Sequence, residues 1–194
     1  MGKLFGITGG IGGGKSVVSS VLKLMGFAVY DCDSRAKWLM NTSPDIKKGL
    51  IAMFGDDVYD TGGMLNRQLL GGKIFNNQDL LDRVNSIVHP VVKQDLAEWC
   101  NSQGTDICFV ESAILYESGL DSMVAGVINV SAPVELRIRR VMARSGLSAG
   151  QVQERINNQN KVLHDAEKDY EIVNDEITPI LPQIVRFLEK EEAL

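Results

Sequence analysis

An eight-residue run near the start of the chain, Gly9–Ser16, constrains the fold more than any other feature. Its sequence, GGIGGGKS, fits the phosphate-binding pattern G-x-x-x-x-G-K-[ST]. The apolar run 4–8 before it indicates a buried strand, and residues 17–25 after it have helical spacing. Glycines allow backbone N–H groups to close around phosphates, and a helix start adds positive potential there. In this pattern the lysine reaches the outer phosphates and the hydroxyl binds Mg²⁺, so Lys15 and Ser16 are candidate functional residues.

The bulk properties of the chain limit its class. It has 194 residues, 44% of them hydrophobic, which is enough for one compact domain or a core with a subdomain. A net charge of −5 argues against a general nucleic-acid binder. No apolar run reaches the ~20 residues of a membrane span, and the early strand leaves no room for a signal peptide. Cys32, Cys100 and Cys108 lack metal-site spacing and cannot all pair, which favours a reducing compartment. We expect a cytoplasmic monomer or weak homo-oligomer without nucleic-acid or membrane partners.

Apolar runs alternate with helical patterns, which predicts a three-layer α/β/α fold with a parallel sheet. Five strands are expected, at 3–8, 27–31, 106–112, 124–131 and 171–174. Helices are expected at 34–40, 44–54, 66–75, 79–98, 134–145 and 180–188, with two helical pieces within 148–168. The stretch 41–104 has no convincing strand, so we expect a helical insert on the substrate side of the sheet.

Carboxylates follow two of the expected strands. In a parallel sheet, ligands bind at the carboxyl ends of the strands, so Asp31 and Asp33 are expected at the same edge as the phosphate loop. If residues 31–33 are extended, the two carboxylates point to the same side of the chain. One carboxylate could order Mg²⁺ through water, and the other could accept a proton from an attacking hydroxyl. The alternative is a solvated turn or a helix N-cap. Glu111 ends another strand, where it could act near magnesium or substrate; the alternative is a charge at the strand end that reaches water.

Four arginines crowd the predicted helix 134–145 of this acidic chain. Arg137, Arg140 and Arg144 share a face at i, i+3 and i+7, whereas Arg139 does not. Arginines of a lid clamp the charge of a transferring phosphoryl group. We expect this role for Arg140 and Arg144, and an ordinary solvated position for Arg137 and Arg139. The segment 145–148 after them has the composition of a hinge.

The remaining polar residues exclude several classes of enzyme. His89 precedes Pro90 at what reads as a helix end, and a lone histidine is more often structural. No H-x-x-x-H, CxxC or Ser/His/Asp arrangement supports a hydrolase or a zinc site. The run 160–163 lacks the aspartate of the guanine-reading Asn-Lys-x-Asp, which argues against a GTPase.

In their order along the chain, several of these motifs resemble those of the dephospho-CoA kinases. The residues that carry the resemblance are Ile7–Ser16, Asp31-Cys32-Asp33 with Ala36, Asn66-Arg67 with Leu70 and Phe75, Val88-His89-Pro90, Ala113–Glu117, Arg140 with Arg144, Arg155 with Gln159, and Asn174. Together they cover about residues 4–175. The phosphate loop alone is common, whereas its combination with Asp-x-Asp, His-Pro and the arginine–glutamine pattern is much more specific.

The resemblance implies a P-loop kinase with a core (about 1–33, 105–139 and 166–194), a CoA-binding insert (about 34–104) and a lid (about 140–165). It also implies transfer of the ATP γ-phosphoryl group to the ribose 3′-hydroxyl of dephospho-CoA, with Mg²⁺. The implied catalytic residues are Asp33 as base, Lys15, and Arg140 in the lid. The implied ATP-binding residues are Gly10, Ile11, Gly12, Gly13, Gly14, Lys15, Ser16, Val17, Arg144 and Asn174. Asp33, Arg67, His89 and Glu111 are expected to bind the acceptor, and Ser16 and Asp31 the metal.

Two other readings stay open. The first is another kinase of this fold that acts on a nucleotide or a small molecule, and the second is a P-loop ATPase switch. A switch needs neither an acceptor base nor a large substrate insert, and this chain is expected to have both. Release of ADP with and without dephospho-CoA would discriminate all three.

Overall fold

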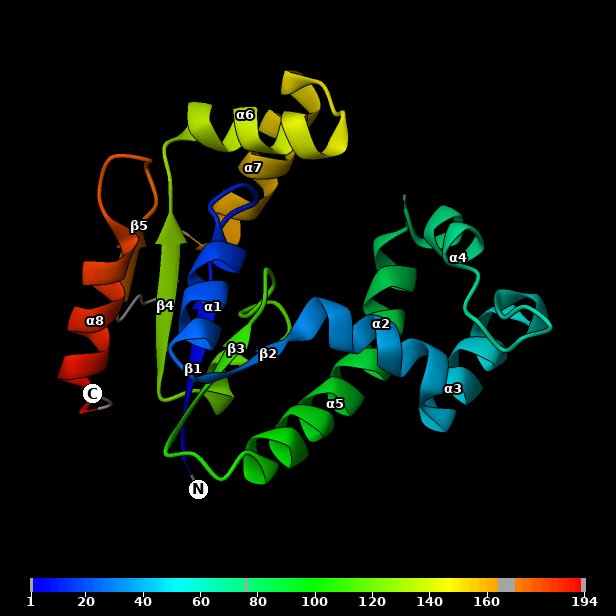
Figure 1. The fold of residues 1–194 in the computed structure, drawn as a ribbon. Helices are drawn as coiled ribbons and strands as arrows, with labels where there is room; N and C mark the ends of the chain where they lie inside the picture. Colours follow the sequence, from blue (N-terminus) through cyan, green and yellow to red (C-terminus); the bar gives the residue numbers. More distant parts are fainter. Residues whose placement is uncertain (1, 76, 164–169, 193–194) are drawn as a thin grey trace. The chain divides into compact units, whose positions relative to one another are not determined.

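The computed structural model of the protein describes residues 2–75, 77–163 and 170–192 (Figure 1). The strands are β1 (Lys3–Thr8), β2 (Ala28–Asp31), β3 (Ile107–Glu111), β4 (Gly126–Ser131) and β5 (Tyr170–Val173). The helices are α1 (Lys15–Leu24), α2 (Cys32–Thr42), α3 (Pro44–Phe54), α4 (Arg67–Ile74), α5 (Gln78–Ser102), α6 (Val134–Ser145), α7 (Ala149–Leu163) and α8 (Ile180–Lys190), with 3₁₀ turns η1 (Asp56–Val58) and η2 (Asp121–Met123). All five expected strands are present, each within two residues of its predicted ends.

The five strands form one sheet in the order β2-β3-β1-β4-β5. β1 pairs in parallel with both β3 and β4, and β4 pairs in parallel with β5. The chain therefore leaves β1 at the point where the strand order changes direction, which is where open α/β sheets bind ligands. The predicted α/β class and parallel sheet are confirmed.

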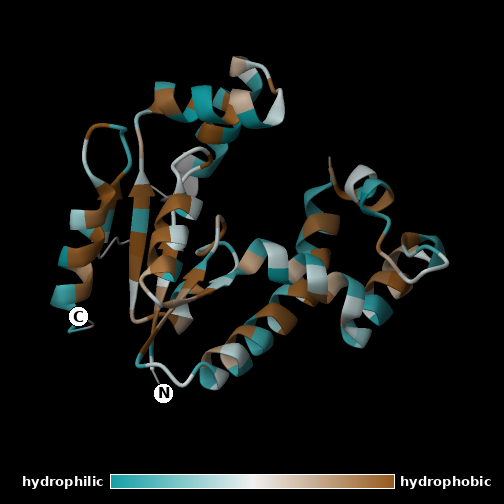
Figure 2. Ribbon diagram, in the orientation of Figure 1, coloured by the Kyte–Doolittle hydropathy of each residue, from teal (hydrophilic) through white to brown (hydrophobic). Residues whose placement is uncertain are grey.

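The main hydrophobic core lies between the sheet and the pair α1 and α8. Phe5 and Phe109 of the sheet meet Phe187 of α8, with ring centroids 5.1 Å and 6.1 Å from it. Val18 and Leu22 of α1 are fully buried in the same cluster. Figure 2 shows the apolar strands against helices of mixed character. Gly26, with φ 94°, ends the turn after α1, as expected for a glycine at this position.

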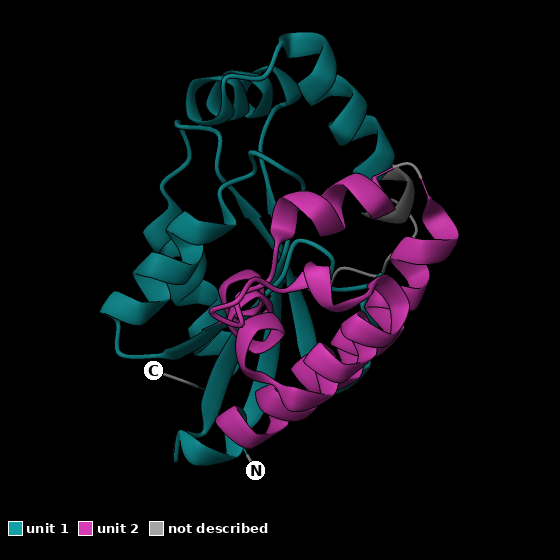
Figure 3. Ribbon diagram, turned by 90° about the vertical axis from the view of Figure 1, so that its right-hand side faces the viewer, with its two compact units in different colours: residues 1–30, 100–194 teal, residues 31–99 magenta. Residues whose placement is uncertain are grey.

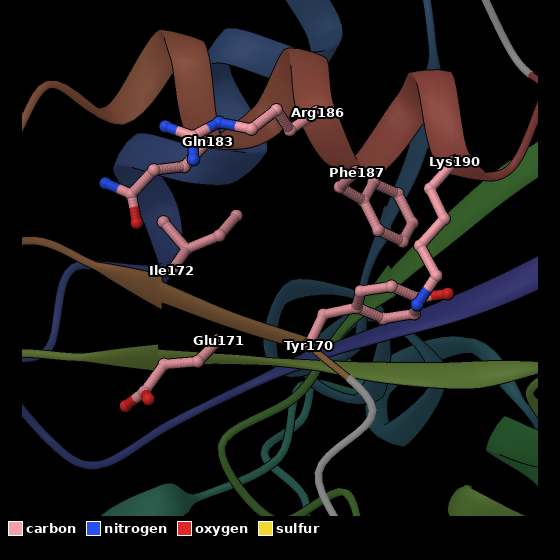
Figure 4. Close-up of a pocket in the computed structure, with 7 residues that line it drawn as sticks. All are labelled: Tyr170, Glu171, Ile172, Gln183, Arg186, Phe187 and Lys190. Atoms are coloured by element: carbon pink, nitrogen blue, oxygen red, sulfur yellow. The ribbon is translucent and has the colours of Figure 1, made fainter.

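A side chain of α8 pairs with the outer edge of β5 at Val173. The Asn174 N–H donates to Ser131 of β4 at 2.8 Å, so the polar groups of Val173 face the outer edge. Gln183 accepts the Val173 N–H at 2.8 Å and donates to the Val173 carbonyl at 2.9 Å. Figure 4 shows Gln183 on α8, with Ile172 directed toward this helix. The amide of Gln183 thus makes the two hydrogen bonds that a neighbouring strand would make with Val173.

The structure consists of two compact units (Figure 3). Residues 1–30 and 100–194 form unit 1, and Asp31–Trp99 form unit 2. Unit 2 contains α2, α3, α4 and most of α5. The Arg35 guanidinium makes two hydrogen bonds, of 2.7 and 2.8 Å, with the carboxylate of Asp95. The proposed limits of the insert (about 34–104), the core and the lid remain predictions.

One detail of the expected elements is wrong, and another lies partly outside the described residues. Within 148–168, expected to hold two helical pieces, Ala149–Leu163 form the helix α7, and 164–168 lie outside the described residues. Pro90 lies inside α5 rather than at a helix end. A proline at this point removes one backbone hydrogen bond but does not end the helix.

Candidate active site

The phosphate loop connects β1 to α1 and turns through glycines with positive φ. Gly12 and Gly14 have φ values of 78° and 97°, and the Gly13 N–H donates to Gly10 across the loop at 3.0 Å. Gly14 is the N-cap of α1, and among the described residues no side chain caps this helix. A Cβ at position 14 would overlap with the amide nitrogen of Asn174, so only glycine fits there. The backbone is therefore shaped to present N–H groups and a helix start to an anion.

Lys15 and Ser16 form the first turn of α1, directly after the loop. Val17 follows them, so the expected nucleotide-binding residues from Gly10 to Val17 are continuous in space. The Lys15 ammonium donates to the carbonyl of Gly9 at 2.7 Å. This bond holds the lysine over the loop, next to the backbone groups that suit phosphate oxygens.

The structure brings Arg140 and Asn174 to the same loop. Arg140 of α6 donates to the Gly12 carbonyl at 3.4 Å and to the backbone and side-chain oxygens of Asn174 at 3.1 and 3.2 Å. Asn174 follows β5 and donates from its buried amide to the Gly13 carbonyl at 3.0 Å. Arg140 also contacts Glu176 at 3.3 Å, where this exposed pair contributes little stability.

The arginines of α6 are arranged differently from the expectation. Arg137, expected in a solvated position, is only 8% exposed, and its Nε donates to the Ile11 carbonyl at 2.9 Å. Burial lowers the pKa of Arg137, although an arginine stays charged. Arg144 is exposed near the end of α6. Arg139 is solvated as expected, where it pairs with Glu176. Helical spacing predicted that Arg137, Arg140 and Arg144 share one face of α6. It did not predict which turn of this helix lies against the phosphate loop.

Gln159 of α7 is a further contact that we did not assign to the site. Its side-chain oxygen accepts the Ile11 N–H at 2.7 Å, across 148 residues of sequence. The arginine–glutamine pattern of 155 and 159 pointed to this segment, but no local signal indicated a bond to the loop. Gly146, with φ 67°, ends α6 shortly before α7 begins; a hinge at 145–148 remains a prediction.

Asp31 and Asp33 do not form the extended pair that we expected. Asp31 ends β2 and is the N-cap of α2, where its carboxylate accepts from the Ser34 N–H at 3.0 Å and the Ser34 hydroxyl at 2.7 Å. Asp33 lies in the first helical turn and is exposed. The helix-cap alternative therefore describes the local structure of Asp31. Both residues belong to unit 2, and their catalytic roles remain predictions.

The other expected acceptor-binding residues lie in both units. Arg67 begins α4, after its N-cap Asn66, and His89 is half-buried within α5. Burial and the nearby charge of Lys93 lower the pKa of His89, which favours the neutral imidazole. Glu111, in unit 1, is in register with Ile7 at the carboxyl end of the sheet. It therefore lies at the edge from which the phosphate loop leaves β1.

The sheet order and the glycine loop with Lys15 and Ser16 define the class of P-loop kinases. A family model for dephospho-CoA kinase matches residues 3–178. The chain belongs to the dephospho-CoA kinase family, as the sequence motifs suggested.

The relatives agree with this assignment. The chain is 45% identical to dephospho-CoA kinase of Porphyromonas gingivalis over 186 residues, which cover 95% of this chain and 92% of the relative. It superposes on a protein from Thermus thermophilus with a TM-score of 0.79, at 31% identity over 99% of this chain and 97% of the other. Dephospho-CoA kinase from Campylobacter jejuni, at 22% identity, has the same fold, with a TM-score of 0.70 over 98% of each chain.

Proposed function

We propose that this protein transfers the γ-phosphoryl group of ATP to the ribose 3′-hydroxyl of dephospho-CoA, with coenzyme A and ADP as products. The observation that carries the proposal is the shaped phosphate loop, with Lys15 and Ser16, in a chain that matches the dephospho-CoA kinase family over residues 3–178. The family defines the acceptor, and the loop defines the chemistry as phosphoryl transfer.

The loop and its neighbours supply the binding of ATP in this proposal. Backbone N–H groups of the loop, among them those of Gly12 and Gly14, and the ammonium of Lys15 receive the phosphates, because donors fixed in advance need no reorganisation during the reaction. Arg140 is already held beside the loop, and Arg144, one turn further along α6, is exposed to solvent. We assign both arginines to the stabilisation of charge on the transferring group.

The residues present fit a magnesium ion bound together with ATP. No group of three or more His, Cys, Asp or Glu side chains that could hold a metal occurs in the described ranges. Mg²⁺ in kinases needs no such cage, because it uses one or two protein groups and the substrate phosphates. The Ser16 hydroxyl would bind the ion, and Asp31 would order its waters. Held by these residues, Mg²⁺ would supply positive charge that offsets the charge of the phosphates.

For the acceptor, we propose that Asp33 takes the proton of the ribose hydroxyl. Its exposed position in the first turn of α2 leaves the carboxylate open to a substrate from solvent. We assign Arg67 and His89 to dephospho-CoA by their places in the motifs, and Glu111 by its place at the carboxyl end of β3. The neutral state favoured for His89 suits a hydrogen-bonding role better than an ionic one.

We also propose that the protein works in the cytoplasm, as a monomer or weak homo-oligomer. All three cysteines are free and buried, which suits a reducing compartment. Among residues 2–75, 77–163 and 170–192, no helix is both long and apolar enough to cross a membrane.

The test is release of ADP from Mg·ATP with dephospho-CoA present or absent, together with mass and NMR analysis of the product. The proposal predicts release that depends on dephospho-CoA and a phosphate on the ribose 3′-oxygen. ADP release at the same rate without any acceptor would identify an ATPase switch instead. A rate that rises only with nucleotides or other small molecules would identify a different kinase of this fold.

A further inference from the structure

We propose that Arg137 and Gln159 are positioning residues of the nucleotide site, which act by holding both backbone polar groups of Ile11 in the phosphate loop. The inference rests on the proposed function only in requiring that the loop binds nucleotide phosphates. It does not depend on the identity of the acceptor.

Ile11 is held from three directions. Its carbonyl accepts from Arg137 Nε at 2.9 Å, and its N–H donates to the Gln159 side chain at 2.7 Å. Its side chain packs against a small hydrophobic cluster of α6 and α7, formed by Val141, Val152 and Ile156, all three of them at most 1% exposed. The tip of the loop is therefore attached to α6 and α7 through one residue.

The direction of the Ile11 carbonyl determines what the loop can bind. A peptide group is planar and trans, so a carbonyl held toward α6 directs the N–H of Gly12 to the opposite side. The carbonyls of Gly12 and Gly13 are held in the same manner by Arg140 and Asn174. The N–H groups of Gly12 and Gly14 are thereby turned toward the anion-binding concavity, while the Gly13 N–H closes the turn by donating to the Gly10 carbonyl. The side-chain contacts thus favour the phosphate-accepting shape of the loop before a nucleotide arrives.

Arg137 adds a charge as well as a bond. Its Nη2 is buried with no hydrogen-bond partner, and no carboxylate pairs with it among the residues that the structure describes. A Cβ at Gly10 would overlap with this same nitrogen, so the guanidinium lies directly against the loop. A buried charge without a counter-ion is unfavourable, and a phosphate in the loop would offset this cost. The nucleotide therefore gains affinity from a cation located behind the loop.

The inference is tested by the affinity of the full-length protein for Mg·ADP, measured by isothermal titration calorimetry. Arg137→Met and Gln159→Met keep the length of each side chain and remove its hydrogen bond. The matched controls are Arg186→Met on α8 and Gln153→Met on α7, whose side chains donate to Pro182 and Asn157 of their own helices. We expect Kd to rise about ten-fold or more for Arg137→Met and about three-fold or more for Gln159→Met, and less than about two-fold for the controls.

Three further measurements separate positioning from a general loss of structure. Circular dichroism and thermal unfolding establish that each variant is folded. The KM for ATP should rise while the KM for dephospho-CoA stays within about two-fold, because a merely destabilised protein would not lose affinity for one substrate alone. The double variant should weaken binding by less than the product of the single effects, since both act through Ile11.

Folded Met variants that bind Mg·ADP within about two-fold of the unchanged protein would overturn the inference. Arg137→Lys provides a second test that keeps the charge but not the Nε donor, and it applies also if Arg137→Met does not fold. Its Kd should rise about three-fold or more, whereas full wild-type affinity would show that the bond to Ile11 has no positioning role. Because Mg·ADP binding needs no acceptor, these outcomes are independent of whether dephospho-CoA is the substrate.

Discussion

Asn174→Ala should destabilise the phosphate loop, although residue 174 lies far from the loop in the sequence. The side chain is 6% exposed and makes two hydrogen bonds, one to the Gly13 carbonyl at 3.0 Å and one from Arg140 at 3.2 Å. The backbone bonds of residue 174, to Ser131 and Arg140, do not involve its side chain and should remain. The substitution therefore removes two specific contacts without removing a strand.

The size of the effect follows from those two contacts. A neutral buried hydrogen bond contributes about 1 kcal/mol, and one to a charged group about 1.5–3 kcal/mol. The Arg140 bond belongs at the lower end of that range because Arg140 keeps its other acceptors. The expected loss is about 2–3 kcal/mol in the free energy of unfolding. For a chain of 194 residues this corresponds to a Tm lower by roughly 4–12 °C.

The assay is thermal unfolding of the two proteins, with and without saturating Mg·ADP. Asn157→Ala is the matched control, because Asn157 is exposed on α7 and its side chain accepts one bond, from Gln153. Its free energy of unfolding should change by less than about 0.5 kcal/mol. If Asn174→Ala unfolds within 1–2 °C of the control (about 0.5 kcal/mol) and binds Mg·ADP equally well, Asn174 does not support the loop.

Three further predictions address the chemistry. Lys15→Ala should nearly abolish turnover in a folded protein, because it removes charge stabilisation and no core packing; an unchanged rate at saturating ATP would exclude the loop from the mechanism. Asp33→Asn should lower kcat by about 10²-fold or more with ATP binding nearly unchanged, and Asp31→Asn should shift the Mg²⁺ requirement; the reverse pattern would mean that the two roles are exchanged. Replacement of both Arg140 and Arg144 by Gln should lower kcat more than it raises the KM for dephospho-CoA, whereas a pure KM effect would indicate a substrate-binding patch.

The sheet and the loop could be predicted because their signals are local. Short apolar runs bounded by turns specified all five strands, and the helix at 134–145 was predicted at its observed ends. The glycine pattern between a strand and a helix specified the loop. These features depend on residues close together in sequence, where periodicity and turn chemistry are informative.

The contacts around the loop could not be predicted from periodicity. They depend on how deeply each side chain is buried and on pairs of residues far apart in the sequence. Arg137 and Arg144 share a helix face, yet only Arg137 is buried against the loop. The bond from Ile11 to Gln159 joins residues 148 positions apart. Asp33 was misplaced as extended chain because Asp31, as a helix cap, begins α2 two residues earlier than expected.

The pairing of Gln183 with Val173 has a consequence for the behaviour of the protein at high concentration. An uncovered edge strand can recruit another chain and so start aggregation. On β5, an incoming peptide would first have to displace two hydrogen bonds made by one amide group. A single glutamine on a helix thus occupies the outward backbone groups of Val173, and the exposed charged side chain of Glu171 on the same strand adds a second obstacle to edge pairing.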